Sequence, residues 1–276
     1  MDDEGGPSNA AAAGALTLAL GLPKAKSSPR IAALAADGGK RCLFRSIVDL
    51  EGRPVAEVAV LHALDQARVW NEPSILAANT ERDFAPIAAL FRDRAVREFG
   101  TAPGLPRDVT LYLPWYCALA SVEAVGPTIG ALLSRSAIAS SRVVLELSVA
   151  TRFSDPGRAP PDRASNEDAD LHLLEKRVVW LRGIGVEIGL RVSGDLALDR
   201  RAIAALRPEW VHIPKAPSDF DDAESLRSLL DAVSTEHDDA RAVIGGVDSP
   251  EEASFAEGLG ARYLSGDAVA PARFLC

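Results

Sequence analysis

Basic side chains stand at or just after the ends of segments that read as buried strands. These residues are Arg152, Arg191, His212 and Lys215. Arg152 also stands three residues before Asp155, so a cation and an anion share one short loop. An arginine binds a phosphate, or the edge of a guanine, through paired hydrogen bonds. The sequence therefore indicates a site for an anionic ligand, assembled from several strand ends.

An aromatic residue and a carboxylate belong to the same set of strand ends. Trp115 follows an apolar segment, and its ring could stack on a base or pack in the core. Glu146 lies within an apolar run, where it either lines the ligand site or forms a structural ion pair with Arg191. Arg152 and Asp155 have a second interpretation as a solvated surface pair. The sequence leaves these alternatives open.

No other chemistry is indicated by the residue pattern. We find no Ser/His/Asp arrangement, no Gly-rich phosphate loop and no metal-ligand cluster that would predict an enzyme. The three cysteines, Cys42, Cys117 and Cys276, are widely spaced and odd in number. This usage predicts free thiols in a reducing cytoplasm, without a disulfide framework or a zinc site. We expect neither a bound metal nor a cofactor.

The composition predicts one large globular domain. The chain has 276 residues, of which 47% are hydrophobic, and a net charge of -9 that argues against a general nucleic-acid surface. The apolar segment Ala10–Leu22 is too short to span a bilayer, and the acidic residues before it do not fit a secretory signal. We expect a flexible leader over residues 1–38, a folded domain over residues 39–276 and no membrane insertion.

The elements that position the candidate residues alternate between strand and helix. Residues 141–195 read as a strand, a Pro/Asp-rich loop, a helix and a second strand, which is typical of a parallel βαβ unit. Further strands are expected over 42–50, 54–61, 109–113, 210–213, 241–244 and 262–264, and further helices over 80–99, 122–138, 199–206, 221–233 and 250–258. This alternation predicts an α/β fold, a (β/α)8 barrel of the TIM type. The turn at Glu51–Gly52 makes the first two strands antiparallel.

Short motifs in order along the chain resemble those of EAL domains, the cyclic di-GMP phosphodiesterases. Phe44–Leu50 resembles the opening Y-Q-P-I-V-D-L of that family. Four further segments resemble L-V-L-E-I-T-E-S, L-R-x-L-G-V-x-L-A-L, L-P-V-D-x-L-K-I-D and A-E-G-V-E-T-x-E: residues 143–150, 181–190, 206–214 and 244–251. The resemblance covers 43–271 and implies a barrel whose first strand is antiparallel to the others, in agreement with the hairpin.

The resemblance also implies which residues would hold the family's catalytic metals, and most are replaced here. Glu146 matches the first Glu of L-E-I-T-E. The family's other metal-site positions, including the assisting Lys, carry Val58, Tyr112, Val149, Arg191, Val192, His212, Pro214, Gly245 and Ser265. Glu57 is one residue from the signature position and would point to the opposite face of its strand. A single carboxylate cannot hold two metal ions, so we expect hydrolysis to be lost.

Several replacements are basic and predict binding without metal. Arg45 stands where the family has Gln, and His62 stands where it has Arg. Arg152-x-x-Asp155 resembles the short motif that holds cyclic di-GMP at allosteric sites of diguanylate cyclases. The complete candidate site is Arg45, His62, Tyr112, Trp115, Glu146, Arg152, Asp155, Arg191, His212 and Lys215.

Two functions of different classes fit this site. The first is a non-catalytic receptor for cyclic di-GMP, or another guanine nucleotide, that passes the signal to an unknown downstream protein. We expect the loop 215–222 to become ordered when ligand binds, because it follows a barrel strand and carries prolines and acidic residues. The second is an interaction-only barrel that no longer binds nucleotide.

Overall fold

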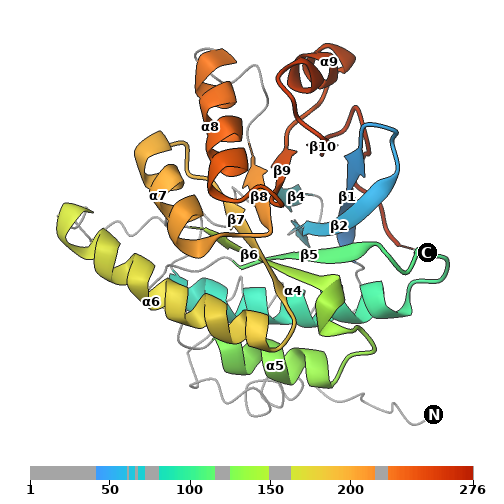
Figure 1. Cartoon of the computed structure of the whole chain (residues 1–276). Helices are drawn as coiled ribbons and strands as arrows, with labels where there is room; N and C mark the ends of the chain where they lie inside the picture. The colour runs from blue at the N-terminus through green and yellow to red at the C-terminus, as the bar shows by residue number, and fades with distance from the viewer. Residues whose placement is uncertain are drawn as a thin grey trace, which may run out of the picture.

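Eight strands close into a barrel in the computed structural model of the chain (Figure 1). The structure describes residues 42–60, 62–65, 68–71, 81–115, 125–148, 163–214 and 223–275. The barrel strands are β1 (Leu43–Asp49), β2 (Pro54–Val60), β5 (Thr110–Pro114), β6 (Val143–Ser148), β7 (Glu187–Arg191), β8 (Trp210–Ile213), β9 (Arg241–Ile244) and β10 (Tyr263–Leu264). Their order around the barrel is β1-β10-β9-β8-β7-β6-β5-β2. The predicted TIM-type barrel is confirmed.

Strand β1 runs antiparallel to both of its neighbours, as the hairpin turn predicted. It pairs with β2 from Leu43↔Val60 to Val48↔Pro54. The other neighbouring strands, in the order β2, β5, β6, β7, β8, β9 and β10, pair in parallel. The seam between β1 and β10 is short, because its register holds two residue pairs, Val48↔Leu264 and Asp49↔Tyr263. Consequently β1 begins at the barrel end where the parallel strands finish.

Helices of the described chain lie on the outer face of the barrel, between consecutive parallel strands (Figure 1). They are α4 (Glu81–Thr101), α5 (Val125–Ser134), α6 (Arg163–Gly183), α7 (Leu196–Leu206), α8 (Ala223–Glu236) and α9 (Pro250–Gly258). The start of α9 was predicted from Ser249. Its side chain accepts a hydrogen bond from Glu252 N, and the Glu252 side chain accepts one from Ser249 N, which makes a capping box. The start of α7 lies earlier than predicted, because Asp195 caps it.

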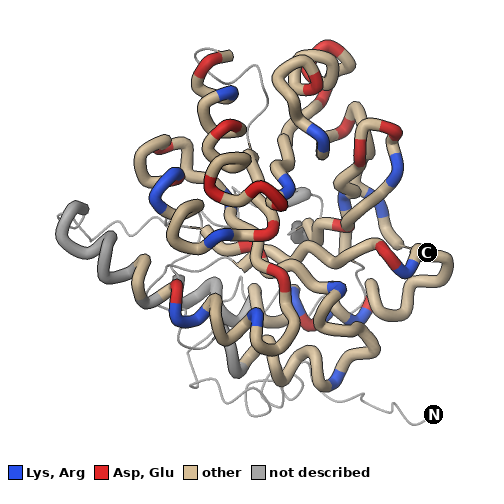
Figure 2. Tube along the Cα trace, viewed as in Figure 1, with Lys and Arg blue, Asp and Glu red and all other residues tan. Residues whose placement is uncertain are grey.

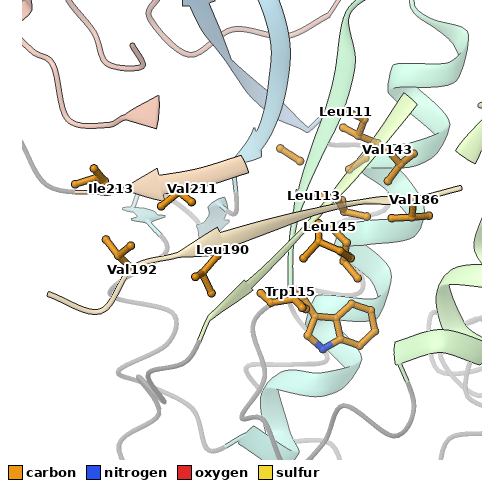
Figure 3. Close-up of a cluster of buried hydrophobic side chains, with 14 of the residues drawn as sticks. Leu111, Leu113, Trp115, Val143, Leu145, Val186, Leu190, Val192, Val211 and Ile213 are labelled. Atoms are coloured by element: carbon orange, nitrogen blue, oxygen red, sulfur yellow. The ribbon is translucent and has the colours of Figure 1, made fainter. Parts of the chain in front are cut away.

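The core has two parts, divided by the alternation of side chains along each strand. The larger cluster fills the space between strands and helices and includes Phe44, Leu145 and Leu190 (Figure 3). A smaller cluster lies inside the barrel and consists of Ile47, Ala56, Val58, Tyr112, Val144, Trp210 and Val243. Because successive residues of a strand face opposite sides, Arg45 shares the inner face with Ile47.

Two strands outside the barrel were not predicted from the sequence. Strands β3 (His62–Asp65) and β4 (Arg68–Asn71) form a separate two-stranded antiparallel sheet outside the barrel order. The predicted second strand was extended to Leu61, whereas β2 ends at Val60. No helix of the described chain is long and apolar enough to cross a membrane. Acidic and basic residues are interspersed over helices and loops (Figure 2).

Candidate functional site

A buried glutamate lies between two basic side chains where β6, β7 and β8 end. Glu146 Oε2 accepts a hydrogen bond from Arg191 Nε at 3.1 Å, and Glu146 Oε1 lies 2.6 Å from His212 Nδ1. The Glu146 side chain is 2% exposed and that of Arg191 is 13% exposed. We call these three residues the inner triad. The ion pair weighed from the sequence is therefore present, and it joins three of the predicted site residues.

The triad keeps its carboxylate ionised. Burial alone would raise the pKa of Glu146, but the charges of Arg191 and His212 and their hydrogen bonds lower it below its usual value. The ion pair between Glu146 and Arg191 is well buried, so salt screens it weakly. The site therefore presents an ionised carboxylate whose charge is balanced by the adjacent arginine.

Tyr112 fills the barrel interior next to the triad. Its ring meets Trp210 and His212 edge-on, with centroids 5.9 and 6.0 Å away. Its hydroxyl is buried and lies so close to Gly189 that a Cβ there would be 2.5 Å from the oxygen. Burial, and next the charge of Glu146, raise the pKa of Tyr112 well above its usual value. Tyr112 is therefore a neutral side chain whose position depends on a glycine.

His212 shows the same dependence on a glycine. A Cβ on Gly245 would lie 2.8 Å from His212 Nε2, so no larger residue fits there without moving the ring. Gly245 occupies the position of a Glu in the resembling motif, and His212 occupies that of the Lys. Each replacement is visible in the sequence, but only the structure shows that His212 fills the space beside Gly245.

Arg45 reaches the rim of the barrel from β1. Its Nη2 donates to Asp267 Oδ1 at 2.8 Å, and the arginine side chain is 31% exposed. Asp267 is itself positioned by its backbone N–H, which donates to Asp248 Oδ1. Arg45 Nε is buried without a hydrogen-bond partner. Asp267 was not among the predicted site residues, since nothing in its neighbourhood distinguishes it from other exposed acids.

Trp115 lies on the outer side of the strand layer. Its ring packs beside α4, where the Arg92 guanidinium carbon lies 3.9 Å from the ring centroid (Figure 3). Only 7% of Trp115 is exposed, so its ring is covered in this conformation. The packing interpretation describes this geometry, and a stacking role for Trp115 stays a prediction that requires Arg92 to move.

Four predicted site residues have no described side chain. His62 opens β3, for which the backbone is described. Arg152, Asp155 and Lys215 lie outside the described residues, as does the loop 215–222. Their part in a site stays a prediction.

The inner strand ends do not fit the divalent metals of the resembling family. Val58 faces the interior with Ile47 and Tyr112. Glu57 points to the other side of the strand, where its Oε1 accepts from Ser46 Oγ at 2.9 Å. Among the described residues, no group of three or more His, Cys, Asp or Glu side chains is placed to hold a metal ion. Arg191 would repel a cation beside Glu146.

Solved structures of several EAL proteins share this arrangement of strands and helices. No family model and no curated protein sequence matches the chain. The FimX EAL domain of Xanthomonas citri, in complex with c-di-GMP, has a TM-score of 0.64 at 16% identity over 85% of this chain and 88% of that one. The PaMucR phosphodiesterase, also a c-di-GMP complex, has a TM-score of 0.63 at 17% identity over 84% of this chain and 90% of that one.

The fold is that of EAL domains. The YkuI protein of Bacillus subtilis, with an EAL domain and solved with substrate c-di-GMP and calcium, has a TM-score of 0.61 at 15% identity. That match covers 82% of this chain, which spans 52% of the YkuI chain. At these low identities the similarity establishes an EAL-like barrel fold alone. The function of such a barrel depends on the residues at its strand ends.

Proposed function

We propose that this EAL-like barrel is a non-catalytic receptor for cyclic di-GMP, or a related guanine nucleotide, and signals through a ligand-dependent conformational change. The observation that carries the proposal is the inner triad. By resemblance, Arg191 stands where EAL phosphodiesterases have a metal ligand and His212 where they have the assisting Lys, and the two side chains enclose a single carboxylate, Glu146. Arginine can hold phosphate oxygens without a metal ion.

The loss of catalysis is supported by how tightly the interior is filled. Tyr112 and His212 take the space beside Gly189 and Gly245, so an added side chain at either glycine meets a ring within 3 Å. A metal ion would need several oxygen ligands in that space. We therefore expect purified protein with magnesium or manganese not to hydrolyse cyclic di-GMP above the buffer rate.

Binding would use the basic residues at the open end of the barrel. The described part of this set is Arg45, Arg191 and His212, and the remaining predicted members are His62, Arg152 and Lys215. The loop 215–222 would become ordered on binding and present a changed surface to a downstream protein in the cytoplasm. Neither nucleic acid nor membrane insertion is part of this proposal.

A second function is favoured by one specific observation. Arg191 already has a carboxylate partner in Glu146, and the pair is buried. An arginine that is neutralised inside the protein has less to gain from a phosphate. This favours an interaction-only barrel, in which the triad has a structural role and the protein binds partners without nucleotide.

Isothermal titration with cyclic di-GMP, in EDTA and again in magnesium, separates these functions. The receptor predicts equal affinity in both buffers and weaker binding at higher salt. Arg191→Ala should weaken binding by about 1.5–3 kcal/mol, the range for hydrogen bonds to charged groups. Arg207→Ala is the matched control, since this residue caps α7 away from the triad. No heat with the folded wild-type protein contradicts the receptor and leaves the interaction-only barrel.

The hydrolysis assay tests the same proposal from the other side. Linear product that appears with the wild type and disappears in Glu146→Gln would show that catalysis remains. Hydrogen–deuterium exchange in the same buffers tests the switch, because ordering of 215–222 predicts slower exchange there when nucleotide is bound. Equal exchange with binding confirmed would exclude this loop as the switch.

A further inference from the structure

The C-terminal segment forms a strap along β1. Phe44 N donates to Arg273 O and Arg273 N donates to Phe44 O, both at 2.8 Å, so the two residues form an antiparallel bridge. Figure 1 shows the end of the chain passing beside the hairpin of β1 and β2. The pairing of β1 with β10 is limited to Val48↔Leu264 and Asp49↔Tyr263. The strap therefore continues the seam of the barrel where β10 no longer reaches.

The side chain of Arg273 adds a second fastening on the outer face of the hairpin. Its Nη1 donates to Ser46 Oγ at 2.8 Å, and its Nη2 donates to Glu57 Oε1 at 2.7 Å. Ser46 Oγ also donates to the same Glu57 oxygen. Ser46 and Glu57 are both almost fully buried, whereas the Arg273 side chain is 47% exposed. One arginine thus joins the last segment of the chain to both strands of the first hairpin.

The two residues that the strap holds are the neighbours of Arg45. Phe44 and Ser46 face outward, and Arg45 between them faces the inside of the barrel, where its guanidinium contacts Asp267. The position of the Arg45 backbone is therefore fixed from both sides by contacts to Arg273. Arg45 Nε is buried without a hydrogen-bond partner. Because β1 carries this side chain, a shift of the strand moves the guanidinium with it.

We propose that Arg273 is a positioning residue, which holds β1 so that Arg45 presents its guanidinium to a phosphate at the rim. This inference rests on the proposed receptor function and adds a residue outside the mouth of the barrel to it. Arg273 acts through the backbone of β1 and does not touch the ligand. A lysine cannot replace it, because an ammonium group lacks the planar fork that reaches Ser46 and Glu57 together.

The test compares Arg273→Ala, Arg273→Lys and the control Arg262→Ala, an exposed arginine beside β10. Cyclic di-GMP affinity should fall by about fivefold or more in both Arg273 variants, the lower limit of typical coupling between separate sites. It should be unchanged in the control. The loss should vanish when Arg273→Ala is combined with Arg45→Ala, since the strap then has no guanidinium to position. An equal loss in that background would overturn the proposal.

Hydrogen–deuterium exchange separates failure of this proposal from failure of the receptor function. Arg273→Ala should speed exchange over residues 43–47 and leave β6 and β7 unchanged, with or without nucleotide. If the wild type binds no cyclic di-GMP, the receptor function fails, and the exchange result alone decides whether Arg273 holds β1. Unchanged exchange over residues 43–47 would overturn the positioning role in either case.

Discussion

Two buried glutamates, one on each side of the strand layer, are pushed toward opposite charge states. Glu146 faces the interior and contacts Arg191 and His212, and its pKa is lowered. Glu57 faces outward; burial raises its pKa, and Ser46 and the half-exposed Arg273 do not offset that effect. One oxygen of Glu57 has no partner. Both carboxyl groups are buried, so the number and burial of their basic partners account for the opposite directions of the two pKa shifts.

The largest expected effect is on stability. Glu146→Gln leaves Arg191 buried without a counter-charge and should lower the free energy of unfolding by about 3–5 kcal/mol. Glu57→Gln keeps an oxygen that accepts from Ser46 and Arg273 and should cost about 1 kcal/mol or less. Urea denaturation of both variants at pH 7 measures the two values. Equal losses would remove the distinction between the two carboxyl groups.

The pH dependence of the same variants should have opposite signs. A lowered pKa means that Glu146 stabilises the protein above the pKa of an unfolded glutamate, about 4.3, and that this contribution is lost as the pH falls through the folded value. A raised pKa means that the contribution of Glu57 is present at low pH and is lost as the pH rises through the folded value. The cost of Glu146→Gln should therefore shrink on acidification. The free energy of unfolding of Glu57→Gln should increase relative to that of the wild type as the pH rises from 4 toward 7. Parallel curves for the two variants would contradict these charge states.

A smaller loss of stability is expected when Tyr112, the uncharged neighbour of the inner triad, is crowded. Gly189→Ala would place a Cβ 2.5 Å from Tyr112 Oη and should cost about 1–3 kcal/mol through overpacking. Adding Tyr112→Phe removes that oxygen and should recover part of the loss. Gly183→Ala, at a glycine with open space around it, is the matched control and should not destabilise. Thermal unfolding of the four proteins measures this, and an unaltered Gly189→Ala melting temperature would contradict the packing argument.

The remaining prediction concerns the reactivity of a buried thiol, Cys42, and not the stability of the fold. Burial, and next the charge of Glu98, raise the pKa of Cys42 to about 12. Its thiolate is the reactive form, so alkylation by iodoacetamide at pH 8 should be at least about 100-fold slower in the folded than in the unfolded protein. Mass spectrometry of the peptide that contains Cys42 follows this site separately from the other thiols. Similar rates in urea and buffer would contradict the burial.

The parts of the fold that depend on local pattern were predictable. The hairpin, the strands β8 and β9 and the capped helix α9 follow from alternation, apolar runs and the Ser249 box. The barrel follows from the strand–helix alternation and the resemblance. The sheet of β3 and β4 was missed because its short strands, His62–Asp65 and Arg68–Asn71, follow β2 without a clear turn signal.

The candidate site was predictable as a set of strand ends but not as a set of contacts. Sequence order put Arg191 and His212 at the ends of neighbouring strands, and parallel pairing brings them to Glu146. The pairing of Tyr112 with Gly189, and of His212 with Gly245, depends on which side chains share the barrel interior. No single segment of sequence contains that information. The packing of Trp115 under Arg92, on the outer side of the strands, could not be predicted for the same reason.

The antiparallel first strand has a consequence for the order in which the molecule can be built. Of the barrel strands β1 is synthesised first, yet one of its edges pairs with β10 and Arg273, which follow all the other barrel strands in the sequence. Until then that edge carries unpaired backbone groups, which other chains could pair with. Contacts between residues so far apart in sequence also form slowly. The nascent barrel should therefore depend on chaperones until Arg273 has left the ribosome, and removing Arg273 and the residues after it should cause more aggregation than removing residues before β1.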